Sequence, residues 1–547
     1  MNRDLNINNF SFVKFFKENF VWVMVFACLV FFTYINSVNN DFISDDIGGI
    51  VNQNISSFEY VREDFSLNRI DFYLRNKISG LNPAVFRFVN IFTHFLSSVL
   101  IFIIFSILIN KKTAIFATTI FVIHPILSES IVWISGAGYI MYSFFFFLSF
   151  LFFILSKKNK LFYIFSTFSF LISINFSEKA FILFLIFPLY TFLFENFKKD
   201  YKRFMPFIIL GSIFAFNSFL YLDKRVENLK YNYSEATILN PFVQIPIAIT
   251  SYLELIFWPE KLTLYHSEMS FSSLDFATRG IIFLGLIIGW IYSYGKNKKV
   301  FFCLSIFFVA LMPFLTPFGI SWIVAERYVY LGSVGIFAIV AVFLDKISGY
   351  KKYRQLIYTV FIVIIISLSI RTMIRNIDWK NEDNFWIATA KNSPSSPNAH
   401  NNLGDVYGRN GDLKGALREF KKAIEIKPNY ADAYHNLANT YKDMGNFEEA
   451  IKNYNNALSI NPYLWQSYQA IAAINFYKQD YDNAIKNLNN AIKINPSNQD
   501  LKLNLAIVYL KIGENDLARK IINNTLSIEP NNVKARELMM QINRSTN

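Results

Sequence analysis

The sequence predicts an all-α protein in two parts, a bundle of membrane-spanning helices followed by an α-solenoid of short helical repeats. Hydrophobic residues make up 53% of the chain and include 61 Phe, which is too apolar for an ordinary soluble protein. The long apolar runs end near residue 372, and prolines then recur every 34 residues from Pro394 to Pro530. We therefore predict a membrane domain at 1–372, a helical connector at 373–396 and a repeat domain at 397–547.

The membrane domain is predicted to cross the bilayer about eleven times, because a helix spans the hydrocarbon core in about 20 residues. The predicted spans lie at 19–37, 89–109, 113–133, 137–155, 161–176, 179–195, 205–222, 279–294, 300–316, 328–346 and 355–371. A further apolar run at 241–258 carries two prolines and a glutamate. We interpret this run as a re-entrant or interfacial segment.

Lysine-rich loops predict the orientation of the chain in a cell membrane. They lie at 111–112, 156–160, 197–203, 296–299 and 351–354, on one side of the membrane if there are eleven spans. The positive-inside rule makes this side cytoplasmic, so the repeat domain is predicted to be extracytoplasmic. These loops also explain the formal charge of +13, and we expect membrane lipids but no nucleic acid as partners.

The repeat domain follows the tetratricopeptide-repeat pattern over about 397–530. One period carries Leu403, Gly404, Tyr407, Ala416, Phe420, Ala423 and Pro428, and three further periods keep similar residues at these offsets. Segment 531–543 is predicted to be a helix that covers the last exposed face. Such an array forms a concave groove for a peptide or protein, although it could instead serve only for stability or oligomerisation.

Polar side chains on the first helix of each repeat are predicted to face this groove. Asparagine can hydrogen-bond an extended peptide backbone without demanding one sequence. The candidate acceptor-binding residues are Asn402, Asp405, Asn436, Asn439 and Asn504.

A second set of polar residues lies at the predicted outer ends of the spans. Ionisable groups at a membrane edge are costly and are usually functional, although each could also cap a helix or form a structural ion pair. This set consists of Asp45, Asp46, Asn90, His94, His124, Glu129, Glu178, Lys179, Glu326 and Arg327, with Arg87 nearby. Because these residues come from distant segments and face one compartment, we predict that they build one site.

Six short motifs followed by the repeats carry a resemblance to a known family. They read NDFISDDIGGI, VFRFVNIFTHF, HPILSESIVWISG, SEKAFILFLIFPLY, AERYVYLGSVG and RNIDWKNEDNFW. In this order the chain resembles the transmembrane and tetratricopeptide repeat-containing O-mannosyltransferases and their prokaryotic relatives. The resemblance implies a GT-C glycosyltransferase fold and an inverting transfer from a polyprenyl-phosphate-linked sugar to a protein.

The resemblance also assigns roles to the candidate residues. Asp45 and Asp46 match the family's catalytic acids, and we favour Asp46 as the base because the second acid is the more consistent one. A base is needed to deprotonate the acceptor hydroxyl, and cations are needed to offset the leaving phosphate. The remaining nine candidates would bind the donor phosphate or sugar. A divalent metal held by the two acids is a further expectation.

An alternative from a different class is a non-catalytic, membrane-anchored scaffold that uses its repeats to assemble a cell-envelope complex. The two alternatives differ in geometry. In an enzyme, Asp45, Asp46, His124, Glu129 and Arg327 should line one cavity, whereas in a scaffold each should be paired locally.

Overall fold

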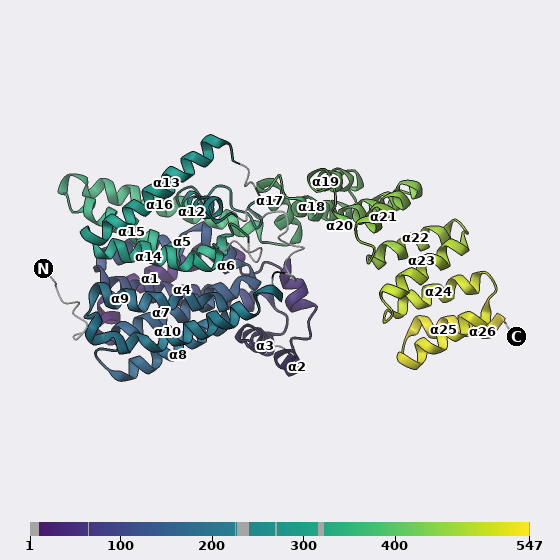
Figure 1. Ribbon diagram of the computed structural model, residues 1–547, viewed down its shortest axis with the longest axis horizontal. Helices are drawn as coiled ribbons and strands as arrows, with labels where there is room; N and C mark the ends of the chain where they lie inside the picture. The colour runs from purple at the N-terminus through teal and green to yellow at the C-terminus, as the bar shows by residue number, and fades with distance from the viewer. Residues whose placement is uncertain are drawn as a thin grey trace. The chain divides into compact units, whose positions relative to one another are not determined.

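The computed structural model describes residues 10–545, apart from Asp64, Arg225, 227–239, 268–270 and 316–321. The described residues are helical or irregular, without strands, as predicted. The chain divides into two compact units, Met1–Asn392 (unit 1) and Ser393–Asn547 (unit 2). Figure 1 shows the helices of both units.

Unit 1 contains the apolar helices. Six of its described helices are long and apolar enough to cross a membrane, and a bent pair at Lys111–Ile123 and Pro125–Val132 would make a seventh. These six are α1 (Phe12–Tyr34), which the 3₁₀ turn η2 extends to Ser37, α4 (Pro83–Leu108), α7 (Ala137–Leu155), preceded by the turn η5 (Ile134–Gly136), α10 (Phe197–Leu220), α13 (Ser273–Lys296) and α16 (Lys351–Asp378).

The other predicted spans coincide with shorter or interrupted helices. Pro125 interrupts one of them, and an eight-residue 3₁₀ segment begins another. They are α5 (Lys111–Ile123) with η4 (Pro125–Leu127) and α6 (Ser128–Val132), α8 (Lys160–Phe176), η6 (Glu178–Leu185) with α9 (Ile186–Phe194), α14 (Lys298–Leu311) and α15 (Ser333–Ser348). The run at 241–258 forms a single helix, α12 (Pro241–Phe257). The count of about eleven spans therefore stays a prediction.

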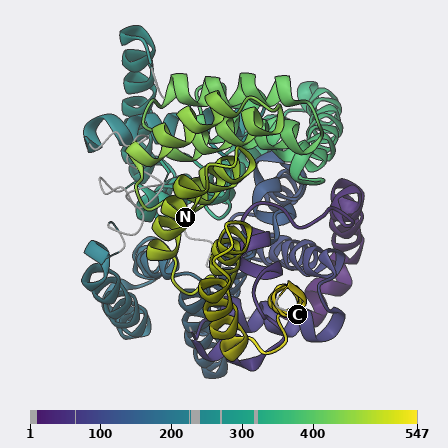
Figure 2. The same ribbon diagram turned by 90° about the vertical axis from the view of Figure 1, so that its right-hand side faces the viewer.

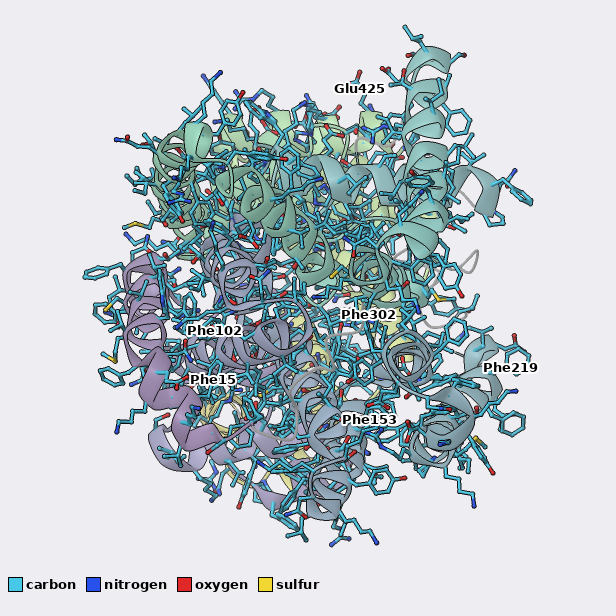
Figure 3. All side chains as sticks on the ribbon, turned by 90° about the vertical axis from the view of Figure 1, so that its left-hand side faces the viewer. Phe15, Phe102, Phe153, Phe219, Phe302 and Glu425 are labelled. Carbon is cyan, nitrogen blue, oxygen red and sulfur yellow. The ribbon has the colours of Figure 1, made fainter. Side chains whose placement is uncertain are left out.

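Aromatic side chains fill the contacts between the helices of unit 1. Phe15 of α1 packs on Phe102 of α4, with ring centroids 5.3 Å apart, and both are labelled in Figure 3. The rings of Phe187 and Phe207 stack at 4.0 Å between α9 and α10. Edge and offset ring contacts of this kind let Phe-rich helices pack without polar groups.

The segment between α1 and α4 forms a small folded layer of its own. It contains the π-helical turn η3 (Ile47–Val51), α2 (Phe58–Glu63) and α3 (Leu67–Ser79). Ile50, Ile55 and Val61 are buried there and pack with Phe86 of α4 and Ile134 of η5. This apolar cluster fixes the segment that carries Asp45 and Asp46 to the helical bundle.

Unit 2 is built from antiparallel helix pairs at the predicted repeat interval (Figure 2). Small residues lie where the two helices of a pair meet: a Cβ on Gly404 would come within 2.6 Å of Phe420. The pairs are α18 (Pro397–Arg409) with α19 (Leu413–Ile426), α20 (Ala431–Asp443) with α21 (Phe447–Ile460), α22 (Trp465–Tyr477) with α23 (Tyr481–Ile494), and α24 (Gln499–Lys511) with α25 (Asn515–Ile528). A final helix, α26 (Val533–Ser545), packs on α25 through Ala535 and Ile542.

The turn inside each pair requires a left-handed residue. Gly411, Gly445 and Gly513 occupy it with φ of 80°, 76° and 86°, and the third repeat has Gln479 there with φ of 63°. Glycine adopts this conformation without a steric cost, whereas for a residue with a Cβ the conformation costs about 1–2 kcal/mol of free energy. The third repeat is therefore strained at this turn.

We expect Gln479→Gly to stabilise unit 2 by about 1 kcal/mol and the reverse change, Gly445→Gln, to destabilise it by a similar amount. The urea midpoint of unit 2 in the full-length chain, measured by pulse proteolysis, checks both variants. Equal midpoints for the two variants would contradict the assignment of strain to this turn.

Candidate active site

A buried arginine shapes the loop at residues 38–46, which carries both candidate acids. Arg87 of α4 is 1% exposed. Its Nη1 donates to the carbonyls of Asn40 (2.5 Å) and Val38 (3.2 Å), and its Nη2 donates to Asp41 (3.0 Å). Its Nε donates to Val132, at 2.8 Å. These bonds use the guanidinium on backbone carbonyls, so Arg87 holds the loop in place, and its binding to the donor stays a prediction.

Asp46 lies beneath the loop surface and is fully buried. Its Oδ1 accepts hydrogen bonds from the backbone N–H of Ser135, at 2.8 Å, and from the Ser135 hydroxyl. Its Oδ2 accepts from the N–H of Ile43, at 3.3 Å. Burial raises the pKa of Asp46 to about 6, although these bonds and the charge of Arg87 oppose the shift. Asp46 therefore joins the loop to η5.

Asp45 differs from its neighbour because it is exposed. Partial desolvation by the surrounding protein raises the pKa of Asp45, and the positive charge of Arg327 opposes this shift. A carboxylate that is accessible, has a raised pKa and lies within the field of a cation fits the role of a general base.

Arg327 is held by a buried ion pair with Glu129. The Arg327 Nη1 group bonds Glu129 Oε1, and the backbone N–H of Arg327 donates to Glu129 Oε2 at 3.0 Å. These contacts join α6 to the 3₁₀ turn η8 (Glu326–Val329). Burial alone would lower the pKa of Arg327, but Glu129 and the neighbouring tyrosines raise it well above its usual value. Arg327 is therefore a permanent, fixed cation.

Lys179 supplies a second cation in the same neighbourhood. Its Nζ donates to the Tyr139 hydroxyl at 3.1 Å and lies 5.4 Å from the centre of that ring. The guanidinium of Arg327 also interacts with Tyr139, so this tyrosine lies between the two cations. We call Glu129, Tyr139, Lys179 and Arg327 the Arg327 cluster. The sequence had pointed to three of these residues but not to Tyr139, which no short motif marked.

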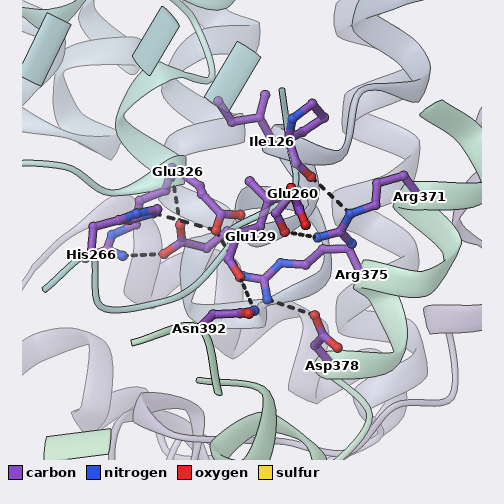
Figure 4. A network of polar contacts seen from close by, with 12 residues as sticks. Ile126, Glu129, Glu260, His266, Glu326, Arg371, Arg375, Asp378 and Asn392 are labelled. Carbon is purple, nitrogen blue, oxygen red and sulfur yellow. Dashed lines mark hydrogen bonds and ion pairs between the residues drawn. The ribbon is translucent and has the colours of Figure 1, made fainter. Parts of the chain in front are cut away.

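Glu326 precedes Arg327 directly and lies in the same polar network as Glu129, but it pairs with other residues (Figure 4). Glu326 Oε1 accepts from Arg375 Nη2 at 3.1 Å, and Arg375 Nη1 bonds Asp378 at 3.0 Å. The Nε2 atom of His266 lies 3.8 Å from the same Glu326 oxygen. Burial raises the pKa of Glu326 to about 8, with the Arg375 charge opposing the shift, and burial lowers the pKa of His266 to about 3. Neither Arg375, which begins the motif RNIDWKNEDNFW, nor His266 was among the site residues predicted from the sequence.

Three further candidates make local contacts inside the helical bundle. Asn90 accepts from Arg75 at 2.8 Å and donates to the Ile131 carbonyl at 3.3 Å. His94 lies between the Tyr330 hydroxyl (2.8 Å) and the Val122 carbonyl (3.3 Å). His124 Nε2 donates to the Ile256 carbonyl at 2.9 Å, and its Nδ1 accepts from the N–H of Ile126. These contacts give the three side chains a part in helix packing and turn formation, and their binding to the donor stays a prediction.

Glu178 begins η6, beside Lys179, and is half-buried. In the part of the chain that the structure describes, no group of three or more His, Cys, Asp or Glu side chains could hold a metal ion. Both carboxylate oxygens of Asp46 also accept hydrogen bonds from N–H or O–H groups. The metal at Asp45 and Asp46 stays a prediction.

Several groove candidates of unit 2 hold the repeats together. Asn436 donates to Asn401 at 3.1 Å, and Asn439 accepts from the buried Tyr454 hydroxyl at 2.6 Å. Asn504 accepts from Lys534 at 2.9 Å. Asp405 is exposed and bonds Arg409 at 3.0 Å, and Asn402 is half-buried on α18.

A cavity of about 260 Å³ lies within unit 2, between the first helices of the third and fourth repeats. Its wall is mostly apolar, with one amide side chain on each of the two helices. It is lined by Gln469, Ala472, Ala473, Phe476, Leu488, Asn504, Ile507 and Val508. Of the five groove candidates, Asn504 alone lines this cavity.

Comparisons with known proteins match both parts of the chain. Family models described as tetratricopeptide repeat match residues 431–464 and 476–542, and one described as TPR repeat matches 409–445. Human "Protein O-mannosyl-transferase TMTC3" is 22% identical over 411 residues, which cover 66% of this chain and 44% of that protein. Drosophila melanogaster "Protein O-mannosyl-transferase Tmtc2" is 33% identical over 131 residues, covering 23% and 14%.

The chain therefore spans less than half the length of these curated relatives. Among solved structures, the crystal structure of MamA is 20% identical, covers 29% of this chain and 87% of that one, and has a TM-score of 0.24. YrrB, described as "a TPR protein with an unusual peptide-binding site", is 15% identical, covers 35% and 96%, and has a TM-score of 0.26. The family models and the curated relatives confirm the resemblance predicted from the sequence.

Asp46→Asn is expected to change how stability depends on pH. Because the pKa of Asp46 is about 6 in the fold and 3.8 ordinarily, the folded state binds a proton more tightly. Protonation of Asp46 should therefore increase the free energy of unfolding of the wild type. This contribution grows as the pH falls through about 6 and reaches its full size below pH 3.8. Asp46→Asn removes this contribution, and its amide places a donor against an N–H group at a cost of about 1–3 kcal/mol.

Thermal unfolding of the detergent-solubilised chain between pH 4 and pH 8 measures this difference, with Glu59→Gln as the exposed control. The same pH slope in wild type and Asp46→Asn would contradict the burial of an ionisable Asp46.

Proposed function

We propose that this chain, a relative of the protein O-mannosyl-transferases that carry tetratricopeptide repeats, is a membrane glycosyltransferase. It transfers a sugar from a polyprenyl-phosphate-linked donor to a hydroxyl group of an extracytoplasmic protein. The names of its relatives favour mannose as the sugar. The observation that carries the proposal is the buried Glu129–Arg327 pair, which fixes a cation whose charge acts on the exposed carboxylate of Asp45.

Asp45, rather than Asp46, is the base in this proposal. The hydrogen bonds of Asp46 occupy both of its carboxylate oxygens, whereas Asp45 is accessible. Asp45 accepts the proton of the acceptor hydroxyl while that oxygen attacks the anomeric carbon of the sugar. The bond from this carbon to the phosphate oxygen breaks, and the phosphate leaves with the electron pair. Attack opposite the leaving group inverts the anomeric centre.

Two cations then stabilise the negative charge of the leaving phosphate. Arg327 is fixed by Glu129, and Lys179 is fixed against Tyr139. Groups held in this way need little reorganisation as charge develops, which is the main requirement for electrostatic catalysis. Of the predicted donor-binding residues, Arg327 and Lys179 are the two that we retain as phosphate ligands.

The lysine-rich loops support an extracytoplasmic site. Lys111, Lys157 and Lys198 follow α4, the α7 helix and α9, which is the alternation expected if α1 runs outward. The same alternation continues to Lys296 if α12 does not cross the membrane. On this topology Asp45, Arg327 and the repeats all lie on the outer side.

The alternative, a non-catalytic scaffold, predicts that the candidate residues are paired only locally. Asn90, His94 and His124 do behave in this way. Asp45, Glu129 and Arg327 instead gather in one neighbourhood, together with Lys179. This gathering, and the names of the relatives, favour the enzyme.

The repeats are proposed to recruit the acceptor through the cavity between α22 and α24. Its apolar wall accommodates a hydrophobic side chain, while Gln469 and the Nδ2 group of Asn504, whose Oδ1 accepts from Lys534, can bind the peptide backbone. Tethering the acceptor would raise its effective concentration near the site to roughly millimolar values.

Asp45→Asn is expected to lower the transfer rate of the purified chain by about 10²–10⁴-fold, the usual contribution of a general base. The acid limb of the wild-type pH–rate profile should lie above pH 3.8, because the pKa of Asp45 is raised. Glu59→Gln, which changes an exposed acid elsewhere in the same segment, should keep the wild-type rate. Full activity of Asp45→Asn would remove Asp45 from the mechanism.

Ala473→Arg is expected to fill the cavity of unit 2. It should raise the KM for the protein acceptor by about tenfold or more, because the lost tether lowers the effective concentration. Hydrolysis of the donor by water should be unchanged. Asn489→Arg, on an exposed position of α23, is the matched control. If Ala473→Arg and Asn489→Arg had the same KM for the protein acceptor, the cavity would not be the docking site.

A further inference from the structure

The residue directly before Asp45 has an unusual backbone conformation. Ser44 has a φ of 53° and, with Gln479, is one of two non-glycine residues with positive φ in the described part of the chain. A residue with a Cβ persists in this left-handed region only when its surroundings hold it there. Whatever holds Ser44 therefore also decides where the next side chain, Asp45, points.

Glu382 is the side chain that contacts Ser44. It is the first residue of α17 (Glu382–Asn392), and its Oε1 accepts the N–H of Ser44 at 2.5 Å. Its Oε2 accepts the indole N–H of Trp386, at 2.9 Å, and Trp386 is buried. Trp386 thus binds one oxygen of the Glu382 carboxylate, and the backbone N–H of Ser44 binds the other oxygen. A charged acceptor makes the stronger kind of hydrogen bond.

Two further bonds join the same segment to the loop. The N–H of Asp41 donates to the carbonyl of Lys380 at 2.8 Å. The side chain of Asn40 donates to the carbonyl of Asn376 at 2.9 Å. The end of α16 and the start of α17 therefore contact the loop from residue 40 to residue 44.

We propose that Glu382 is a positioning residue for Asp45: it holds Ser44 in the left-handed conformation and so fixes the direction of the base. This inference rests on the proposed function, in which Asp45 accepts the proton. Glycine at position 44 would adopt the conformation without help. The chain has serine there and supplies the restraint from α17, the last helix before unit 2 in the sequence.

The kinetic test compares Glu382→Ala with Ser44→Gly/Glu382→Ala. Glu382→Ala should lower kcat by about 10–100-fold, the effect of misplacing a catalytic group by about 1 Å, with the donor KM nearly unchanged. The double variant Ser44→Gly/Glu382→Ala should have a kcat at least about threefold higher than that of Glu382→Ala, because glycine removes the steric cost of the conformation. Glu59→Ala, the same change at an exposed glutamate, should keep the wild-type kcat.

A merely structural role for Glu382 predicts no rescue by Ser44→Gly, and that result would overturn the proposal. So would a Glu382→Ala variant with the wild-type kcat.

Hydrogen exchange separates this inference from the proposed function, since it needs no transfer activity. In the full-length chain in lipid nanodiscs, Glu382→Ala should speed deuterium uptake in peptides covering residues 40–47, and Glu59→Ala should not. Faster uptake in a chain without transferase activity would support the restraint on Ser44 while refuting the proposed function. Unchanged uptake in Glu382→Ala would refute the restraint itself.

Discussion

The buried ion pair between Glu129 and Arg327 is the contact on which the rest of the site depends. Burying two charges costs several kcal/mol for each ion, and their attraction repays this only when the geometry is good and other bonds are satisfied. Here the carboxylate also accepts the backbone N–H of Arg327, so α6 and η8 are joined by two bonds. Stability alone is a weak reason for such a pair. The pair does fix a permanent cation whose charge acts on Asp45.

Adjacent residues have opposite roles at two places in this site. Asp46 is buried against Ser135, while Asp45 is exposed, and Glu326 pairs with Arg375, while Arg327 pairs with Glu129. In each case the two residues are consecutive in a helical turn, the turn that follows the left-handed Ser44 or the 3₁₀ turn η8, so their side chains point in different directions. One residue of each pair anchors the backbone, and the other, Asp45 or Arg327, is the one that takes part in the proposed reaction.

The repeats and the helical class followed from the sequence because both rest on periodicity, which is local. The roles of single residues could not be predicted from the sequence, because a short motif does not determine the burial of a side chain or its contacts with distant segments. Arg87 matched a phosphate ligand by charge and position, yet its partners are carbonyls of a loop more than 40 residues away in sequence. Tyr139 was not predicted because it lies in an apolar run. Glu382 lies in the motif RNIDWKNEDNFW, but nothing in that charged connector marks it as a contact of Ser44. The number of spans was uncertain for a related reason: Pro125 and the 3₁₀ segment η6 interrupt runs that look continuous in hydropathy.

The central claim is that this chain glycosylates proteins outside the membrane with Asp45 as its base. Mass spectrometry of cell-surface proteins can compare cells without the gene, cells complemented with wild type and cells complemented with Asp45→Asn. We expect sugar-bearing Ser or Thr peptides with wild type only, although both proteins reach the membrane in equal amounts. The same glycopeptides in all three samples would contradict the account.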